Sequence, residues 1–559
     1  MECNGKYIAT PPLKMTERSW PSKQITKAPV WCSVDLRDGN QALENPMGIE
    51  TKVQYFKLLV KLGFKQIEVG FPSSSDTEFY FVRKLIEDNL IPDDVYIQVL
   101  TQEKDSLIKK TFEAVKGAKN VIFHIYNATS PAHRKYNFKK SKDEILALAV
   151  SGVKFTKKYI PHYPETNFIL EYSPEAFSQT EIDFSIKICE AVMKEWGASK
   201  DKKIILNLPT TVESSMPNHF ADMIEYFSTH IKNRENCIIS LHNHNDRGEG
   251  VAQCELGLLA GAERVEGCLF GNGERTGNLD IVTVALNMYT QGIDPELDFS
   301  NIPKIAEKYS YYTGMAIPPR LPYAGELVFT AFSGSHQDAI RKAMNARAKM
   351  SSDSLWDVPY LLIDPHDIGR RYEGIIRFNS QSGKGGAAYI LEKDFGIIAP
   401  KLMHPVIGSV IKKVADKKQR ELKPHEIYDI FEKEWLNTKS PLNVLEITEK
   451  HIEGERNSGK PEQVASIAAV EWAGKRYAIA ASGNGPLDAF VAAMKQTPAP
   501  IFNITSFHEH SIGEGSDTHA IAYVQITLED GTQKWGVGKS SNVGRAGIAA
   551  VVSALNFKQ

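Results

Sequence analysis

Eight short β-branched runs, each followed by a stretch with helical periodicity, lie between residues 30 and 270 of the chain. The spacing between successive runs leaves room for one helix each time. Strands that alternate with helices pair in parallel, and eight such units have the size of a closed (β/α)8 barrel. The predicted strands are Val30–Leu36, Gln66–Phe71, Val95–Leu100, Asn120–Tyr126, Asn167–Tyr172, Lys203–Leu208, Cys237–Leu241 and Arg264–Phe270.

The segments between these runs support the barrel. Residues 48–63 place apolar side chains on one helical face and end at a glycine, which is typical of an amphipathic helix with a C-terminal stop. An open, doubly wound sheet is the competing arrangement, and it would require a G-x-G-x-x-G turn after the first strand. That strand instead runs into Asp35–Asn40. We therefore predict the (β/α)8 barrel.

Composition excludes several classes of protein. The 66 Lys and Arg residues are balanced by 68 Asp and Glu, giving a net charge of −2, whereas a nucleic-acid-binding protein normally carries a basic surplus. No run approaches the roughly 18–20 apolar residues that a membrane-spanning helix needs, and the N-terminus lacks the apolar core of a signal peptide. The 6 cysteines contain no C-x-x-C pair, which is typical of reduced, buried thiols. We expect a cytoplasmic protein that binds neither nucleic acid nor membrane.

Polar side chains gather where the predicted strands end. The C-terminal ends of the strands carry the catalytic groups of this fold. Here the first strand leads to Arg37 and Asp38, the fifth carries Glu171, and the seventh leads to His242 and His244. We expect polar side chains at this rim and none in the strand bodies.

His242 and His244 indicate a metal site. Residues two apart on a strand project to the same face, and imidazole is the commonest neutral metal ligand. The carboxylate of Asp38 and the amide oxygen of Asn278 would complete a mixed nitrogen and oxygen shell around a divalent Lewis acid. We expect Mg2+, and the same donors also admit Mn2+ or Zn2+.

Three neighbouring groups are predicted to act on ligands. Beside a metal ligand, the guanidinium of Arg37 is suited to clamping a carboxylate or a polarised carbonyl. Glu171 is either a structural partner of Arg37 or an acid/base group, and we favour the catalytic interpretation. The glycine-rich loop Gly271–Asn278 follows the eighth strand, where this fold often binds phosphate; its Gly273, Glu274 and Arg275 are predicted to hold a nucleotide-like cofactor. A second glycine-rich segment, residues 382–386, lacks Walker spacing and predicts a tight turn.

Taken together, the motifs resemble those of the 2-isopropylmalate synthase family. This family belongs to a group of metal-dependent Claisen-type enzymes that also holds homocitrate and citramalate synthases and hydroxymethylglutaryl-CoA lyase. The matching segments are Asp35–Gln41, Leu241–Asp246, Gly271–Asn278 and Ser333–Ala339. The resemblance implies condensation of acetyl-CoA with 3-methyl-2-oxobutanoate and hydrolysis of the thioester to 2-isopropylmalate and CoA, the first committed step of leucine biosynthesis.

The resemblance also implies roles for individual residues. The cation would be held by Asp38, His242, His244 and Asn278, with Arg37 supporting the developing alkoxide. Thr211 would hold the carboxylate of the keto acid. His336, with Glu171, would take the methyl proton of acetyl-CoA, and it would reach in from a neighbouring subunit, so that the active enzyme is a homodimer.

The second half of the chain predicts further domains. We expect an N-terminal arm over residues 1–29, the barrel over 30–300, a mainly helical linker over 301–430 and an α+β domain over 431–559. Residues 468–494 and 521–555 each read as strand, turn, strand and helix, so the last domain is predicted to hold two ββα-like repeats packed as one unit. The resemblance implies that leucine binds this domain and inhibits the enzyme.

Two questions stay open at this stage. Citramalate and homocitrate synthases share the metal ligands, so a barrel acting on pyruvate or 2-oxoglutarate is the alternative, and the preference for isopropylmalate rests on the linker motif and the repeat. In the C-terminal domain His508, His510 and His519 with Asp517 are residue types that bind metals. Residues 507–518 are rich in glycine, serine and acids, so they predict a loop rather than a second metal site.

Overall fold

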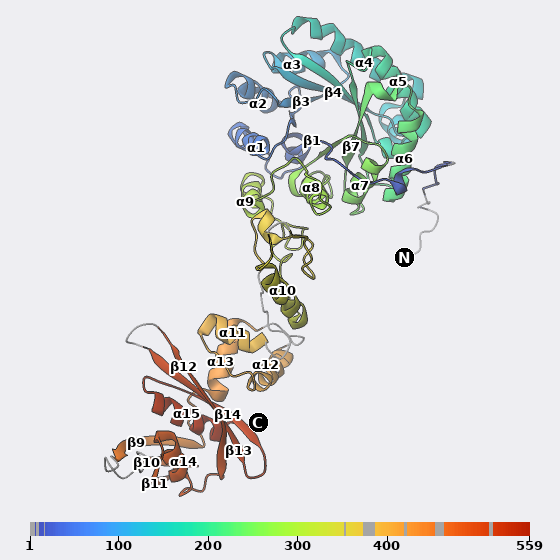
Figure 1. Ribbon diagram of the computed structural model, residues 1–559. Coiled ribbons are helices and arrows are strands. Elements are labelled where there is room, and N and C mark those ends of the chain that lie inside the picture. The colour runs from blue at the N-terminus through green and yellow to red at the C-terminus, as the bar shows by residue number, and fades with distance from the viewer. Residues whose placement is uncertain are drawn as a thin grey trace. The chain divides into compact units, whose positions relative to one another are not determined.

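The computed structural model describes residues 6, 10–15, 17–331, 333–351, 354–372, 386–418, 422–452, 463–513 and 518–558. The chain divides into two compact units. The first consists of Met1–Phe329 and Leu362–Tyr372, and the second of Thr330–Leu361 and Glu373–Gln559 (Figure 1). Asp517 and residues 382–385 of the second glycine-rich segment lie outside the described residues, as does Cys3; the other five cysteines are buried and free.

The first unit is built around a closed parallel barrel, as predicted. Its strands follow one another in chain order, and β1 closes the barrel by pairing with β8 through Val30 and Arg264. The strands are β1 (Val30–Ser33), β2 (Gln66–Gly70), β3 (Tyr96–Gln102), β4 (Asn120–Ala128), β5 (Asn167–Glu175), β6 (Ile204–Thr210), β7 (Cys237–Asn243) and β8 (Arg264–Gly267).

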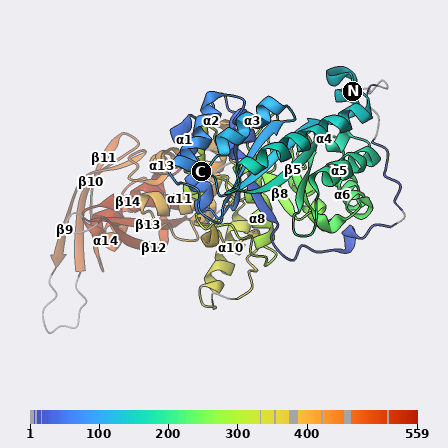
Figure 2. The ribbon, with the colours of Figure 1, turned by 90° about the horizontal axis from the view of Figure 1, so that it is seen from above.

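Eight helices surround these strands (Figures 1 and 2). Local sequence sets their ends: α4 begins at a capping box between Ser141 and Glu144, and α5 ends at Gly197, whose φ is 76°. The helices are α1 (Ile49–Lys61), α2 (Asp76–Glu87), α3 (Asp105–Val115), α4 (Lys142–Tyr159), α5 (Ile182–Trp196), α6 (Pro217–His230), α7 (Gly250–Leu259) and α8 (Ile281–Tyr289). Helix α9 (Ile302–Thr313) follows them, and no described helix is both long and apolar enough to cross a bilayer.

The first and eighth strands are shorter than predicted. After Ser33 the chain turns into a π-helical segment, Asp35–Gly39, and after Gly267 it forms a 3-10 turn, Leu269–Gly271. The apolar residues that suggested longer strands are buried in these turns instead of extending the sheet. The buried carboxylate of Asp35 joins the two turns by accepting from the backbone N–H of Leu269 at 3.1 Å.

The barrel interior also differs from the prediction. The expectation that strand bodies carry no polar side chains is wrong. Inside the barrel lie buried polar side chains from four strands, namely Glu68, Gln98, His124, Arg264 and Glu266. They alternate with apolar residues that face the helices, as the two-residue period of a strand requires.

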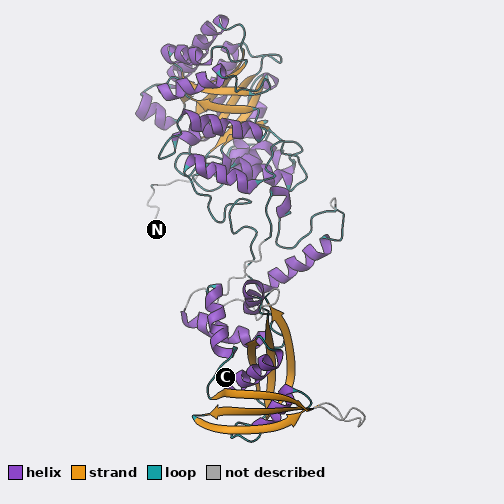
Figure 3. Cartoon of the chain, turned by 90° about the vertical axis from the view of Figure 1, so that its left-hand side faces the viewer, coloured by secondary structure: helices purple, strands orange, loops and turns teal. Residues whose placement is uncertain are grey.

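In the described part of the second unit, four helices precede two sheets (Figure 3), and each sheet is followed by a further helix. The helices are α10 (Gly334–Arg347), α11 (Gly386–Phe395), α12 (His404–Lys418) and α13 (Pro424–Trp435). One antiparallel sheet consists of β9 (Leu442–Ile452), β10 (Gln463–Trp472) and β11 (Lys475–Gly483), followed by α14 (Pro486–Met494). The other consists of β12 (Phe502–Ile512), β13 (His519–Leu528) and β14 (Gln533–Ser540), followed by α15 (Val543–Asn556).

The predicted repeat is present, but each copy is βββα rather than ββα. The strands missed from the sequence, β9 and β12, lie at sheet edges. Most of their side chains are exposed or only partly buried. An edge strand of this kind gives no apolar run that would reveal it in the sequence.

Candidate metal centre at the barrel mouth

Three side chains from distant parts of the chain meet at the carboxyl ends of the barrel strands. Asp38 lies in the turn after β1, His242 is the penultimate residue of β7, and His244 directly follows that strand. The Nε2 atoms of His242 and His244 lie 3.3 Å and 3.7 Å from the same carboxylate oxygen of Asp38. One potential ligand atom from each residue lies within 4.8 Å of the others, and all three residues are buried. The structure thus brings together the three residues that the sequence singled out.

Asn278 lies beside this group because it forms an antiparallel β-bridge with His244. Its Nδ2 donates to the carbonyl of Asn272 at 3.2 Å, whereas its buried Oδ1 has no hydrogen-bond partner among the described residues. Leaving a buried acceptor unpaired costs about 1–3 kcal/mol, so a ligand is expected there. Two imidazoles, a carboxylate and an amide oxygen fit a divalent cation.

The charges at the site are mutually dependent. Burial opposes ionisation of Asp38, but Arg37 and His242 outweigh it and hold the pKa of that carboxyl well below its usual range. Burial likewise disfavours the cation of His242, but hydrogen bonds to Asp38 and Glu266 raise its pKa to about 9. Burial and the nearby charge of His242 lower the pKa of His244 to about 4. In the metal-free site at neutral pH, His242 is therefore a charged imidazolium and His244 is a neutral imidazole.

Glu266, on β8, fixes the orientation of the His242 ring through a hydrogen bond to Nδ1. Its Oε2 accepts from His242 Nδ1 at 2.7 Å and from Asn207 Nδ2 at 3.1 Å. Its Oε1 accepts from Arg264 Nη1 and Gln98 Nε2, both at 2.8 Å. Four donors therefore surround one fully buried carboxylate, and the Nδ1 proton of His242 leaves Nε2 free to act as a ligand.

Arg37 is held between two carboxylates next to the metal ligands. Its Nη1 lies 2.9 Å from Asp38 Oδ1, and its Nε donates to Glu68 Oε2 at 2.5 Å. The other oxygen of Glu68 lies 2.9 Å from His124 Nδ1. Burial works against the charge on Arg37, but Glu68 and Asp38 outweigh it and raise its pKa. The guanidinium is thus a fixed positive group beside the candidate cation site.

Glu171 lies inside the barrel and has no solvent exposure. The alternative that it pairs with Arg37 is wrong, because Arg37 pairs with Glu68 and Glu171 lies 3.3 Å from Arg264 Nη2. Burial, opposed by Arg264, raises the pKa of Glu171 well above its usual range. Its role as an acid/base group stays a prediction.

Glu175 is a candidate that the sequence did not reveal. It is the last residue of β5, at the carboxyl end of the barrel. Burial raises its pKa, Arg37 lowers it and Asp38 raises it, so its carboxyl lies within the electrostatic field of the site. The strand predicted from the sequence ends at Tyr172, whereas β5 continues through Pro174 to Glu175. The signal available in the sequence was the position of Glu175, a carboxylate shortly after the predicted end of the strand, where this fold places functional groups.

The remaining predicted ligand-binding residues lie in the loops above the mouth. Thr211 Oγ1 accepts from the backbone N–H of Ala176 at 2.9 Å. Glu274 accepts from Gln41 Nε2 at 3.1 Å, and Arg275 binds Asp246, with 2.7 Å between Nε and Oδ1. Gly273 has no side chain to contribute, so any ligand would meet its backbone.

His336 belongs to the second unit, whereas the metal ligands and Glu171 belong to the first. It lies in the first turn of α10, and its ring stacks on Tyr360 with 4.1 Å between centroids. The proposed pairing of His336 with Glu171 therefore stays a prediction.

The histidines of the C-terminal domain are placed on strands. His508 and His510 lie on β12 and His519 begins β13, so the loop predicted there is wrong for the part of the segment that is described. The Nε2 of His510 accepts from the backbone N–H of Ile398 at 3.2 Å and lies 3.1 Å from the hydroxyl of Tyr523. Within the described ranges, Asp38, His242 and His244 form the one group with metal-ligand geometry.

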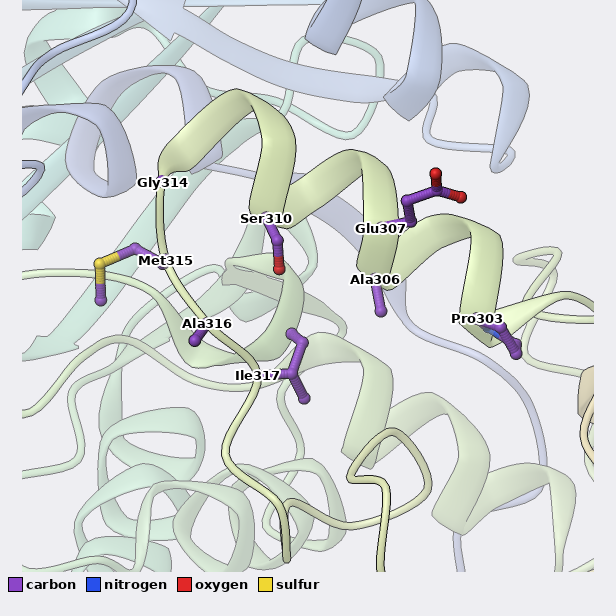
Figure 4. A pocket seen from close by; sticks show the side chains of 8 residues that line it. All are labelled: Pro303, Ala306, Glu307, Ser310, Gly314, Met315, Ala316 and Ile317. Atoms are coloured by element: carbon purple, nitrogen blue, oxygen red, sulfur yellow. The ribbon is translucent and has the colours of Figure 1, made fainter.

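A cavity of about 450 Å³ lies between α9 and residues 314–317 (Figure 4). Ala306, Ser310 and Ile317 are among its lining residues. None of the residues predicted to bind metal or substrate lines it. This cavity is therefore separate from the group of Asp38, His242 and His244.

Comparison with known proteins agrees with this geometry. Residues 28–308 match the family described as HMGL-like, which places the barrel and its mouth in that class. Residues 326–392 match the alpha-isopropylmalate synthase post-catalytic domain, and residues 421–559 match the LeuA allosteric (dimerisation) domain.

Relatives that match the chain along its full length identify the family within this class. A 2-isopropylmalate synthase of Clostridium acetobutylicum is 54% identical over 99% of this chain and 99% of the relative. Enzymes with the same name from Acetoanaerobium sticklandii and Pseudomonas fluorescens are 50% and 49% identical, each over 99% of this chain and over 96% and 97% of their own. The chain belongs to the 2-isopropylmalate synthase family. Among solved structures, an HMG-CoA lyase of Pseudomonas aeruginosa aligns with 53% of this chain and 96% of its own at 17% identity and a TM-score of 0.44.

Proposed function

We propose that this chain condenses acetyl-CoA with 3-methyl-2-oxobutanoate and hydrolyses the thioester to give 2-isopropylmalate and CoA, the first committed step of leucine biosynthesis. The observation that carries the proposal is the group of Asp38, His242 and His244 at the mouth of the barrel. It occurs in a chain that matches 2-isopropylmalate synthases along 99% of its length. The relatives named above all bear that name, which disfavours citramalate or homocitrate synthesis.

The side chains of the mouth fit an enzyme that activates a keto acid. Asp38, His242, His244 and Asn278 would hold a divalent cation, for which we propose Mg2+, and the bound cation supplies Lewis-acid polarisation of the ketone. Arg37 has N–H groups beyond those engaged by Glu68 and Asp38, and it donates to the oxygen on which negative charge develops.

Condensation also requires a base for the methyl proton of acetyl-CoA. We retain His336 as the proposed base, supplied by a neighbouring subunit. Glu175 is better placed than Glu171 to act with it, because it lies at the end of β5 while Glu171 is enclosed inside the barrel. Burial raises the pKa of Glu175, which favours a role in proton exchange.

Substrate and inhibitor contacts complete the proposal. Thr211 would bind the carboxylate of the keto acid, and Gly273 and Glu274 would contact acetyl-CoA through the loop backbone. Leucine would bind the C-terminal domain and inhibit the homodimer; the match of residues 421–559 to an allosteric dimerisation domain supports this.

The test measures CoA thiol release from acetyl-CoA with 3-methyl-2-oxobutanoate, pyruvate or 2-oxoglutarate, each with and without leucine. We expect strong preference for 3-methyl-2-oxobutanoate and inhibition by leucine. A preference for pyruvate or 2-oxoglutarate would overturn the proposed keto-acid substrate. Activity that leucine does not change would overturn the proposed inhibition by leucine.

A further inference from the structure

A chain of hydrogen bonds ties together the loops that follow four neighbouring barrel strands. Arg275, after β8, makes a two-point contact with Asp246, after β7: Nε lies 2.7 Å from Oδ1 and Nη2 lies 3.1 Å from Oδ2. The same Nη2 donates to the backbone carbonyl of Thr211, after β6, at 2.5 Å. Thr211 in turn accepts from the N–H of Ala176, after β5. We call Arg275, Asp246 and Thr211 the Arg275 clamp.

The clamp joins the two loops that carry the predicted metal ligands. Asp246 is two residues beyond His244, and Arg275 is three residues before Asn278. A backbone hydrogen bond of 3.1 Å from Asn245 to the carbonyl of Gly277 links the same two loops. Moving Arg275 away from Asp246 would therefore loosen the β-bridge between His244 and Asn278.

The Gly271–Asn278 loop is folded tightly against Asn278. A Cβ on Gly277 would lie 2.0 Å from the carbonyl oxygen of Gly271, and a Cβ on Gly273 would lie 2.3 Å from Asn278 Nδ2. Arg275 itself has a φ of 56°, a left-handed conformation that non-glycine residues rarely adopt. Such a conformation persists only when surrounding contacts hold it, and the contacts to Asp246 and Thr211 do so here.

We propose that Arg275 is a positioning residue that, through its clamp, presents the unpaired Oδ1 of Asn278 and the imidazole of His244 to the cation. This inference rests on the proposed function, since it concerns the same metal site. It is an alternative to the sequence-based prediction that Arg275 helps to hold a nucleotide-like cofactor. A guanidinium already engaged by a carboxylate at two points and by a carbonyl is poorly available to a second anion.

Phosphate binding and loop positioning by Arg275 predict different effects of the substitution Asp246→Asn. If Arg275 binds phosphate, removing the competing charge with Asp246→Asn frees the guanidinium and lowers the KM for acetyl-CoA. If Arg275 positions the loop, Asp246→Asn and Arg275→Gln break the same contact and have the same effect. Arg247→Gln is the matched control, because Arg247 lies in the same loop as Asp246, is 43% exposed against 41% for Arg275, and pairs through its side chain with Glu249.

The experiment measures Mn2+ affinity by titration calorimetry on the full-length protein, and then KM for acetyl-CoA. We expect Arg275→Gln and Asp246→Asn each to weaken Mn2+ binding about tenfold, as loss of groups that orient metal ligands commonly does. The double variant should be no worse than either single one, because the two residues act through one contact. Arg247→Gln should bind Mn2+ within about twofold of wild type.

Unchanged Mn2+ affinity in Arg275→Gln, with a raised KM for acetyl-CoA alone, would overturn the inference. Additive losses of Mn2+ affinity in the double variant would also overturn the inference. If Arg275→Gln does not fold, Arg275→Lys serves instead, since lysine keeps the charge but cannot make the two-point contact, and it should weaken Mn2+ binding in the same direction. Absence of CoA release by the wild type would overturn the proposed function. The role of the Arg275 clamp would still be decided by the calorimetry, because that measurement needs no turnover.

Discussion

Replacing Glu266 with glutamine tests how the barrel interior controls the proposed metal ligand His242. Two donors face each oxygen of the Glu266 carboxylate, with Arg264 and Gln98 on one side and His242 and Asn207 on the other. A glutamine offers one acceptor oxygen, and the permanent cation of Arg264 should attract it. The amide NH2 then faces His242 Nδ1, which must either lose its partner or move its proton to Nε2, the atom needed as a ligand.

The size of the effect follows from this geometry. An unpaired buried donor costs about 1–3 kcal/mol, and about 1.4 kcal/mol corresponds to a tenfold change in an equilibrium constant. We therefore expect Glu266→Gln to weaken Mn2+ binding by about 10- to 100-fold, in line with the usual effect of removing a partner of a metal-bound histidine. Titration calorimetry with Mn2+ measures it directly.

Glu171→Gln is the matched control for this variant. Glu171 is equally buried and lies 3.3 Å from the same Arg264, but no metal ligand is among its hydrogen-bond partners in the described part of the chain. Mn2+ affinity should stay within about twofold of wild type. Wild-type affinity in Glu266→Gln, or an equal loss in both variants, would refute the reasoning.

Three further predictions concern catalysis and pH. His336→Ala should leave metal content intact and lower kcat at least about a hundredfold; near-normal turnover would remove His336 from the mechanism. Glu175→Gln should lower kcat at least about tenfold without changing Mn2+ affinity, and a kcat within twofold of wild type would exclude a role in proton transfer. Because the pKa of His242 is raised to about 9 in the metal-free site, a cation must displace its proton below that pH. Mn2+ affinity should therefore rise about tenfold per pH unit from about pH 7 and level off near pH 9, whereas a flat profile over this range would contradict the charge assignment.

The barrel and the cluster of Asp38, His242 and His244 were predictable because each leaves a local signal. The regular spacing of β-branched runs indicated eight strands, and closure of the barrel then placed all strand ends at one mouth. The two-residue separation of His242 and His244 put both imidazoles on one side, and topology alone brought Asp38 to them. No contact between distant residues had to be known beforehand.

The groups that support those ligands were not predictable in the same way. Arg264 and Glu266 are two residues apart in a short strand, and charged residues of these types are rarely fully buried. Their burial depends on Gln98, Glu171 and Asn207 from other strands, which the sequence does not place against them. The contact between Arg275 and Asp246 was not predictable for the same reason, since Asp246 comes from a separate loop.

Spectroscopy of the Mn2+-loaded protein tests the metal site most directly. Electron–nuclear coupling at the bound ion should reveal two imidazole nitrogens, one lost in His242→Gln and the other in His244→Gln, with both retained in His336→Ala. Spectra without imidazole coupling, or spectra that neither substitution alters, would show that these side chains do not hold the cation.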